Sequence, residues 1–279
     1  MAKLNKTILK WAGSKVRIME QLRPHLPKTK RLVEPFAGSC AVMMNTDYEQ
    51  YLIADINNDL MNLYTQIKCS VDLFIALSKA HFANGNNENM FYEKRDIFNI
   101  KFPTEHLLGE IVVLNDAALF LYLNRHGYNG LCRYNQKGKF NVPFGQNKTI
   151  YFPENEIIAF KIKAQKADIV NLVWQDTLSL VENNDGIYCD PPYMGGRESF
   201  TQYHTTGFSN TDHEALAIAL KDINDNQGNP VTVSNSPEAK ALYADLGFTI
   251  YEIEAPRTIA ANGNRKTATE IIAVLSGNK

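Results

Sequence analysis

Two short apolar stretches separated by a glycine turn constrain the fold of this chain more than any other feature. Residues 31–36 (RLVEPF) are predicted to form a buried strand, residues 37–39 form a turn that contains Gly38, and residues 40–45 begin a helix. A second apolar stretch, YLIAD, then ends in Asp55. This order of strand, glycine turn, helix, strand and acid is typical of the opening of a doubly wound, nucleotide-binding α/β sheet.

The pattern changes after the second strand and resumes about ninety residues later, which is outside the normal length of a loop. Residues 57–126 show helical apolar spacing, and residues 127–150 are rich in Gly, Asn and Pro with short β-like pieces. We therefore predict one α/β sheet interrupted by a helical and hairpin insertion. After residue 154 we expect helices over 156–167, 211–224 and 237–246, and strands over 169–173, 186–190, 231–235, 248–254 and 270–275.

Charge is distributed unevenly, although the formal net charge of the chain is only -1. Residues 1–31 carry a net charge of +8, and residues 117–153 carry +5 with no acidic residue and eight aromatic ones. Basic side chains interleaved with aromatic ones suit the phosphates and bases of a nucleic acid. The alternative is an ordinary solvated face, which is the commoner fate of a charge cluster.

Several classes of protein are disfavoured by the sequence. No apolar run of about 18 residues occurs, and the first residues lack an apolar signal core, so we expect neither a membrane span nor secretion. The four cysteines form no CxxC pair and the six histidines form no HExxH motif, so we expect no metal site. The chain also lacks the GxxxxGK[ST] motif of P-loop ATPases. A reducing, cytoplasmic setting is the simplest interpretation.

The most specific motif is Asp190-Pro191-Pro192-Tyr193, which directly follows an apolar stretch. Its prolines fix φ and remove two backbone donors, so the aspartate and the carbonyls form a rigid cluster of acceptors. Such a cluster suits the primary amino group of a planar base, and Tyr193 offers a face on which that base stacks. A base in a duplex reaches such a pocket only when it is flipped out. The alternative is a Pro-Pro turn that ends the strand with a capping Asp.

Two other segments suit a bound cofactor. Gly38 allows a ligand to lie against the backbone at a strand end, and Asp55 is placed like the acid that binds a ribose hydroxyl pair. An ordinary βα turn is an equally good interpretation of this isolated glycine. Nearer the N-terminus, the run Leu9-Lys10-Trp11-Ala12-Gly13-Ser14-Lys15 suits an anionic or zwitterionic ligand, or else a basic arm with a packed tryptophan.

In this order, the three motifs resemble the adenine-specific DNA methyltransferases whose cofactor motif precedes Asp-Pro-Pro-Tyr. Residues 117–145, AALFLYLNRHGYNGLCRYNQKGKFNVPFG, are similar to the target-recognition segment of the Dam family, which modifies GATC. The resemblance covers nearly the whole chain. It implies a Rossmann-like S-adenosylmethionine-dependent methyltransferase sheet over residues 1–57 and 154–279, with a target-recognition domain inserted over residues 58–153.

The resemblance also implies roles for individual residues at the cofactor and the reacting base. Trp11 and Lys15 match the N-terminal cofactor motif, and Asp55 matches the ribose-binding acid. Asp190 matches the catalytic acid, which also lies beside the cofactor. Asp176 either lies beside the adenine of the cofactor or caps the following helix. Direct methyl transfer from S-adenosylmethionine is expected, with S-adenosylhomocysteine as the product and no metal.

A further set of residues is implied to contact double-stranded DNA. Tyr128 resembles an intercalating aromatic and Asn129 a phosphate contact. Arg133 resembles a guanine reader, whose planar fork fits O6 and N7, and Lys10 resembles a contact to the first guanine. The remaining implied contacts are two apolar ones to a thymine methyl, from Leu131 and Pro143, and a further polar one from Asn135. We expect a monomer in solution with no membrane partner.

The sequence departs from the family pattern at several positions. Ser14 and Cys40 stand where the family has glycine, and Gln146 and Asn147 stand where it has Arg and Tyr. Two rival functions remain: amino methylation of RNA or of a protein glutamine, and a catalytically silent DNA-binding regulator. A protein target favours Asn where this chain has Asp190, and the intact motif argues against a silent regulator.

Overall fold

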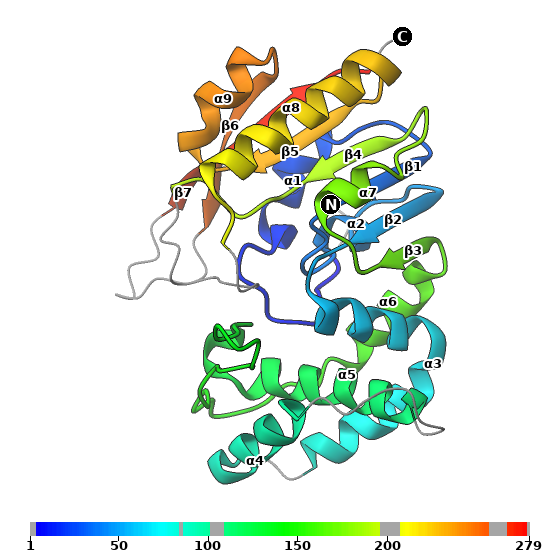
Figure 1. Cartoon of the computed structure of the whole chain (residues 1–279). Helices are drawn as coiled ribbons and strands as arrows, with labels where there is room; N and C mark the ends of the chain where they lie inside the picture. The colour runs from blue at the N-terminus through cyan, green and yellow to red at the C-terminus, as the bar shows by residue number, and fades with distance from the viewer. Residues whose placement is uncertain (1–3, 84–85, 101–108, 196–206, 257–266, 278–279) are drawn as a thin grey trace.

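A computed structural model describes residues 4–83, 86–100, 109–195, 207–256 and 267–277. Its described residues form a seven-stranded sheet with the order β3-β2-β1-β4-β5-β7-β6 (Figure 1). Strand β7, the last along the chain, is antiparallel to its neighbours β5 and β6, and the other pairings are parallel. The strands are β1 (Arg31–Glu34), β2 (Gln50–Ala54), β3 (Ala167–Val170), β4 (Gly186–Cys189), β5 (Val231–Asn235), β6 (Thr249–Pro256) and β7 (Thr267–Leu275).

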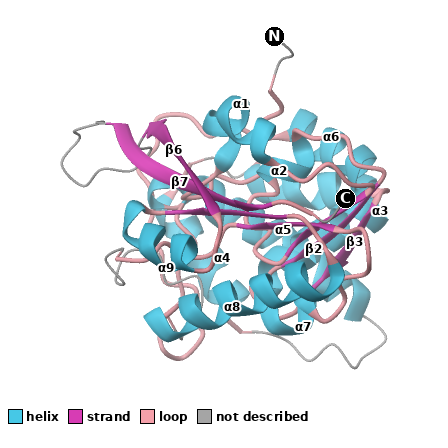
Figure 2. Ribbon diagram, turned by 90° about the horizontal axis from the view of Figure 1, so that it is seen from above, coloured by secondary structure: helices cyan, strands magenta, loops and turns pink. Residues whose placement is uncertain are grey.

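Helices cover both faces of this sheet. Figure 2 shows α1, α2 and α6 on one face and α7, α8 and α9 on the other. This arrangement explains why the central strands β4 and β5 are buried along their whole length. The helices are α1 (Met19–Leu22), α2 (Ala41–Met44), α3 (Asn58–Phe82), α4 (Glu88–Phe98), α5 (Gly109–His126), α6 (Glu154–Ala164), α7 (Trp174–Leu178), α8 (Asn210–Gln227) and α9 (Lys240–Asp245).

Local sequence signals fix where the longer helices begin and end. Asn57 caps α3, since its side chain accepts a hydrogen bond from the backbone N–H of Leu60 at 3.0 Å. Ser209 and Asp212 form a capping box at the start of α8, which ends at Gly228 with φ +76°. These caps satisfy backbone groups that the first and last turns leave without a partner.

Between β2 and β3 the chain leaves the sheet through α3, α4, α5 and the loop that follows them (Figure 1). Helix α3 begins beneath the sheet and is kinked at Ser70, where φ is −139° and ψ is 47°. One hydrophobic cluster runs from Leu32 and Ile53 in the strands, through Tyr64 of α3, to Phe120 of α5. The sheet and the segment between its strands therefore share a continuous core.

The predicted elements are confirmed in type and order, with differences at their ends. The strand expected over 169–173 instead begins at Ala167 and ends at Val170, because its register with β2 pairs Tyr51 with Ala167. The helix expected to begin at Cys40 starts one residue later, since Cys40 has a left-handed φ of 55°. The last predicted helix divides into a short 3-10 turn and α9.

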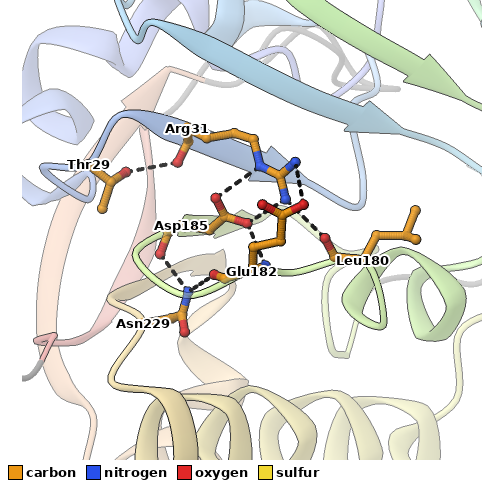
Figure 3. Close-up of polar contacts among 6 residues, drawn as sticks. All are labelled: Thr29, Arg31, Leu180, Glu182, Asp185 and Asn229. Carbon is orange, nitrogen blue, oxygen red and sulfur yellow. Dashed lines mark hydrogen bonds and ion pairs between the residues drawn. The ribbon is translucent and has the colours of Figure 1, made fainter.

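A polar cluster joins β1 to the loop before β4 at the amino ends of these strands (Figure 3). The Arg31 guanidinium donates to both carboxylate oxygens of Asp185, at 2.9 and 2.7 Å, and to the carbonyl of Leu180. Asn229 donates to the carbonyls of Asp185 and Glu182. This cluster fixes the start of the central strands and lies at the opposite end of the sheet from the carboxyl termini of the strands.

Candidate active site

The glycine turn after β1 holds the acid at the end of β2. The backbone N–H of Gly38 donates to Asp55 Oδ2 at 3.0 Å, and that of Asn57 donates to Asp55 Oδ1 at 2.9 Å. Gly38 has φ +46°, and a Cβ there would lie 3.0 Å from Nε1 of Trp11. The turn therefore needs glycine both for its backbone angle and for the close approach of Trp11. Trp11, Gly38 and Asp55 lie together at the carboxyl edge of the sheet.

The second part of the same edge is built around Asp190, the residue after β4. Lys15 Nζ lies 2.8 Å from Asp190 Oδ2, and only 5% of the lysine side chain is exposed against 20% of the aspartate. The same Nζ donates to the carbonyl of Gly13 and lies 4.9 Å from the centroid of the Tyr193 ring. One buried cation thus orients both ends of the Asp-Pro-Pro-Tyr motif. Pro191 is buried and Pro192 is exposed.

Buried acids surround this ion pair. Burial raises the pKa of Asp190 to about 6, although the adjacent Lys15 acts in the opposite direction. Burial and the charge of Asp190 raise the pKa of Glu34, at the end of β1, to about 8. Burial likewise raises the pKa of Asp55. A site with this many carboxyl groups in a low dielectric favours a cationic ligand.

The loop after α5 carries most of the residues predicted to contact DNA. Tyr128 is 51% exposed, and Asn129 is also exposed with a left-handed φ of 53°. Pro143 is exposed as well, and its carbonyl accepts a hydrogen bond from the backbone of Tyr128. Leu131 is half-buried against the core. The side chains of Tyr128, Asn129 and Pro143 are therefore accessible to a ligand, and that of Leu131 is partly so.

The remaining predicted contacts have partners within the protein. Arg133 Nε donates to Asn141 Oδ1 at 2.8 Å. Asn135 Oδ1 accepts from the backbone N–H groups of Lys137 and Lys139, so its side chain shapes a turn. Lys10 packs closely on the loop: a Cβ added at Gly130 would lie only 2.2 Å from the Cβ of Lys10. The N-terminal arm and the loop after α5 therefore meet at Lys10.

Comparison with known proteins gives the same assignment over almost the whole chain. The family model of the D12 class N6 adenine-specific DNA methyltransferases matches residues 11–259. The chain belongs to this family. It is 48% identical to the retron Ec67 DNA adenine methylase of Escherichia coli over 271 residues, which cover 96% of this chain and 90% of that protein. The DNA adenine methylase of Serratia marcescens is 40% identical over 276 residues, covering 98% and 99% of the two chains.

The predicted family and enzyme class are thereby confirmed: the chain is an adenine-specific DNA methyltransferase, and DNA is its substrate. Its α/β sheet agrees with the fold expected of methyltransferases that use S-adenosylmethionine. No described helix is long and apolar enough to cross a membrane. Among the described residues, no group of three or more His, Cys, Asp or Glu side chains is arranged to hold a metal ion.

Sequence reasoning missed three residues that hold the Asp-Pro-Pro-Tyr loop of this DNA methyltransferase. Tyr193 donates its hydroxyl hydrogen to Glu270 Oε2 at 2.7 Å. The backbone N–H of Met194 donates to Asn235 Oδ1, and Ser236 donates to the carbonyl of Met194. Two polar residues at the end of an apolar strand, Asn235 and Ser236, could have been predicted to lie at the site from the sequence. No sequence pattern indicated Glu270, because only the antiparallel placement of β7 brings it to this edge.

Asp176, the remaining predicted cofactor residue, lies in the helix that follows the carboxyl end of β3. Asp176 is exposed in the first turn of α7, and it makes no hydrogen bond or ion pair with another described residue. Val173 occupies the N-cap position, so the expectation that Asp176 caps this helix is wrong. His204 and all but the last residue of the basic segment 257–267, a further candidate for a phosphate contact, lie outside the described residues.

Proposed function

We propose that this enzyme transfers a methyl group from S-adenosylmethionine to the N6 amino group of the adenine in GATC, within duplex DNA and after base flipping. The observation that carries the proposal is the cluster at the end of β4. There, Asp190 lies beside a buried lysine and Tyr193, at the edge where open α/β sheets bind ligands. The GATC target rests on the resemblance of residues 117–145 to the recognition segment of the Dam family.

The residues at the carboxyl edge fit S-adenosylmethionine. Asp55 is held by two backbone N–H groups, with its carboxylate available to the hydroxyl pair of a ribose. Trp11 lies against Gly38 and offers an aromatic wall, and the acids around Asp190 favour a sulfonium cation. When bound, the cofactor supplies an activated methyl group. Lys15 and Asp190 are then charged partners for its amino-acid end and for the reacting base.

The proposed chemistry requires only that the amine be oriented. The Asp190 carboxylate and the Pro191 carbonyl accept the two hydrogens of the amino group, which turns the nitrogen lone pair out of the ring plane. Tyr193 stacks on the base and holds it against these acceptors. The bound cofactor would supply the methyl group to this nitrogen and leave as S-adenosylhomocysteine, and the methylated amine would pass its extra proton to solvent through the Asp190 carboxylate. The protein contributes alignment and charge placement, without a covalent enzyme intermediate.

We assign target recognition to the inserted residues 58–153 together with the N-terminal arm. Arg133 reads a guanine through its guanidinium, and Lys10 contacts the first guanine of the site. Tyr128 enters the space that the flipped base leaves, and Leu131 and Pro143 contact a thymine methyl. Asn129 contacts a phosphate, and Asn135 makes a further contact to the DNA. The exposure of Tyr128, Asn129 and Pro143 supports this assignment.

The test is transfer of a labelled methyl group to matched duplexes. We expect label on a GATC duplex, much less on a duplex with one altered base pair, and none on RNA of the same sequence. Asp190→Ala should abolish turnover but keep most of the DNA affinity, because Asp190 acts on the base after binding. Near-normal turnover by this variant would contradict the mechanism, and equal labelling of all duplexes would contradict the GATC target.

A further inference from the structure

The two neighbours of Arg133 are both attached to the start of α3. Tyr134 donates its hydroxyl hydrogen to Asp59 Oδ2 at 2.7 Å, and Asn57 Nδ2 donates to Cys132 Sγ at 3.6 Å. Successive side chains of an extended segment point to opposite sides. Tyr134 pairs with Phe140 in an antiparallel bridge, which is consistent with such a backbone. Cys132 and Tyr134 thus face α3, and Arg133 faces away from it.

The anchoring contacts are shielded from water. Asp59 is 9% exposed and Cys132 is 2% exposed. A hydrogen bond to a carboxylate in such surroundings is stronger than one between neutral groups at the surface. The sulfur contact is long and weak, so the hydrogen bond between Tyr134 and Asp59 is the stronger of these two polar contacts between the segment and the start of α3. The Tyr134 ring also packs on Phe140, edge to face, with centroids 5.8 Å apart.

Arg133 depends on the position of its backbone. Its Nε donates to Asn141 Oδ1, and the N–H of Asn141 donates to the Arg133 carbonyl at 3.0 Å. Nη2 of Arg133 also lies 3.4 Å from the Asn141 carbonyl, so the outer hydrogens of the two terminal nitrogens are the edge that the fork can present to a base. A shift of this backbone by about 1 Å would disturb a bidentate contact, whose geometry is strict.

The same stretch of chain that holds Asp59 also holds the acid of the cofactor site. Asp55 and Asp59 are separated by the N-cap of α3, and Asn57 contacts both Asp55 through its backbone and Cys132 through its side chain. The segment that carries Arg133 is therefore bonded to residues at the carboxyl edge of the sheet and not to another surface loop.

We propose that Asp59 and Tyr134 are positioning residues for sequence recognition: their hydrogen bond fixes Arg133 relative to the catalytic edge of the sheet. The proposal rests on the proposed function, in which Arg133 reads a guanine. Asp59 and Tyr134 touch neither base nor cofactor in this scheme. They act through the backbone of Arg133, so their loss should reduce discrimination at one base pair more than it reduces methyl transfer.

The test compares Tyr134→Phe and Asp59→Asn with the wild-type enzyme. Each removes the hydrogen bond to the carboxylate with little change in volume. The measurement is kcat/KM on a GATC duplex and on duplexes altered at one guanine–cytosine pair. Loss of a bidentate arginine–guanine contact costs roughly 5- to 150-fold in discrimination, so a displaced Arg133 should lose about 3- to 10-fold. The loss should fall on the guanine read by Arg133, with kcat on GATC changed by less than about twofold, because Asp59 and Tyr134 make no contact that is formed only in the transition state.

Tyr48→Phe is the matched control, because the Tyr48 hydroxyl donates to the carbonyl of Pro27 at the amino side of the sheet. It should leave discrimination unchanged. A double-mutant cycle gives the sharper result: in an Arg133→Ala background, Tyr134→Phe should have no further effect on discrimination.

Two outcomes would overturn the proposal alone. One is an equal fall in kcat/KM on all duplexes, which indicates a general loss of structure and which melting temperatures would register. The other is full additivity of Tyr134→Phe and Arg133→Ala. If Arg133→Ala itself leaves discrimination intact, the reader assignment in the proposed function fails, and this inference fails with it.

Discussion

At the scale of single residues, the ion pair between Lys15 and Asp190 controls the acid that the reaction needs. The proposed mechanism uses Asp190 as a carboxylate, because both of its oxygens are then acceptors and its negative charge strengthens the hydrogen bonds from the lysine and the amine. Burial raises the pKa of Asp190 to about 6, and Lys15 acts to lower it. The fraction of active enzyme should therefore rise as the pH increases through about 6.

Replacing Lys15 by Gln tests this relation. Without the cation, burial acts unopposed by Lys15, so the pKa of Asp190 rises and the acid limb of the pH profile moves to higher pH. The profile to measure is kcat/KM for the cofactor, since it reports groups of the free enzyme. Arg17→Gln, at an exposed position two residues along, is the control and should leave the limb in place. If the acid limb of the profile stayed at the same pH in Lys15→Gln, a group other than Asp190 would limit activity at low pH.

Two of the four departures from the family pattern, Cys40 and Ser14, have a direct structural consequence. Cys40 stands where the family has glycine, and its φ of 55° lies in the left-handed region that favours glycine. Ser14 has an ordinary φ of −54°, and its hydroxyl accepts a hydrogen bond from Ser39 at 3.0 Å. One substitution therefore carries backbone strain, and the other links the N-terminal arm to the glycine turn. The sequence identified both positions but not which of them is strained.

At the scale of elements, the parallel strands were the most predictable part of the fold. Their buried apolar runs end in polar residues or turns, so β1, β2, β4 and β5 followed from local pattern, together with Asp55 after β2 and Asp190 after β4. The antiparallel insertion of β7 between β5 and β6 depends on pairing between distant segments, which no local pattern reports. That is why Glu270, on β7, was not predicted at the site.

The polar cluster of Figure 3 gives a prediction about strand β1 and the loop before β4. Asp185→Ala removes the bidentate partner of the largely buried Arg31 guanidinium and leaves it Glu182 at 3.5 Å, so the loss of unfolding free energy should approach the roughly 3–5 kcal/mol of a broken buried pair. Activity at low temperature should stay near normal, because the cluster lies at the amino ends of the strands. Chemical denaturation and methyl transfer measure the two effects.

An exposed ion pair provides the comparison for that variant. Lys240 and Glu252 lie 2.7 Å apart with about half of each side chain exposed to solvent. Lys240→Ala should therefore lower the free energy of unfolding by no more than about 1 kcal/mol. If Asp185→Ala and Lys240→Ala lowered the free energy of unfolding equally, the difference in burial between the two ion pairs would not determine their contribution to stability.

At the scale of the whole molecule, α3 joins the sheet to the segment inserted between β2 and β3. Its first half packs beneath the sheet, with Tyr64 donating to the carbonyl of Gly38 at 2.7 Å and stacking on Phe160. Beyond the kink at Ser70 it packs on α5. The sequence predicted an insertion, but it gave no sign that one helix belongs to both parts. The position of a shared helix depends on packing, and apolar spacing alone does not report it.

This shared core predicts a single unfolding transition. Both tryptophans, Trp11 and Trp174, lie in the part of the chain that carries the sheet, whereas much of the helical signal comes from α3, α4 and α5. Tryptophan fluorescence and far-ultraviolet circular dichroism should therefore give coincident melting curves. Phe120→Ala removes a fully buried ring of α5 and should cost about 3–5 kcal/mol. Because the cluster is continuous, the variant should lower both midpoints equally. If the circular dichroism midpoint fell while the fluorescence midpoint stayed, the inserted helices would unfold independently of the sheet.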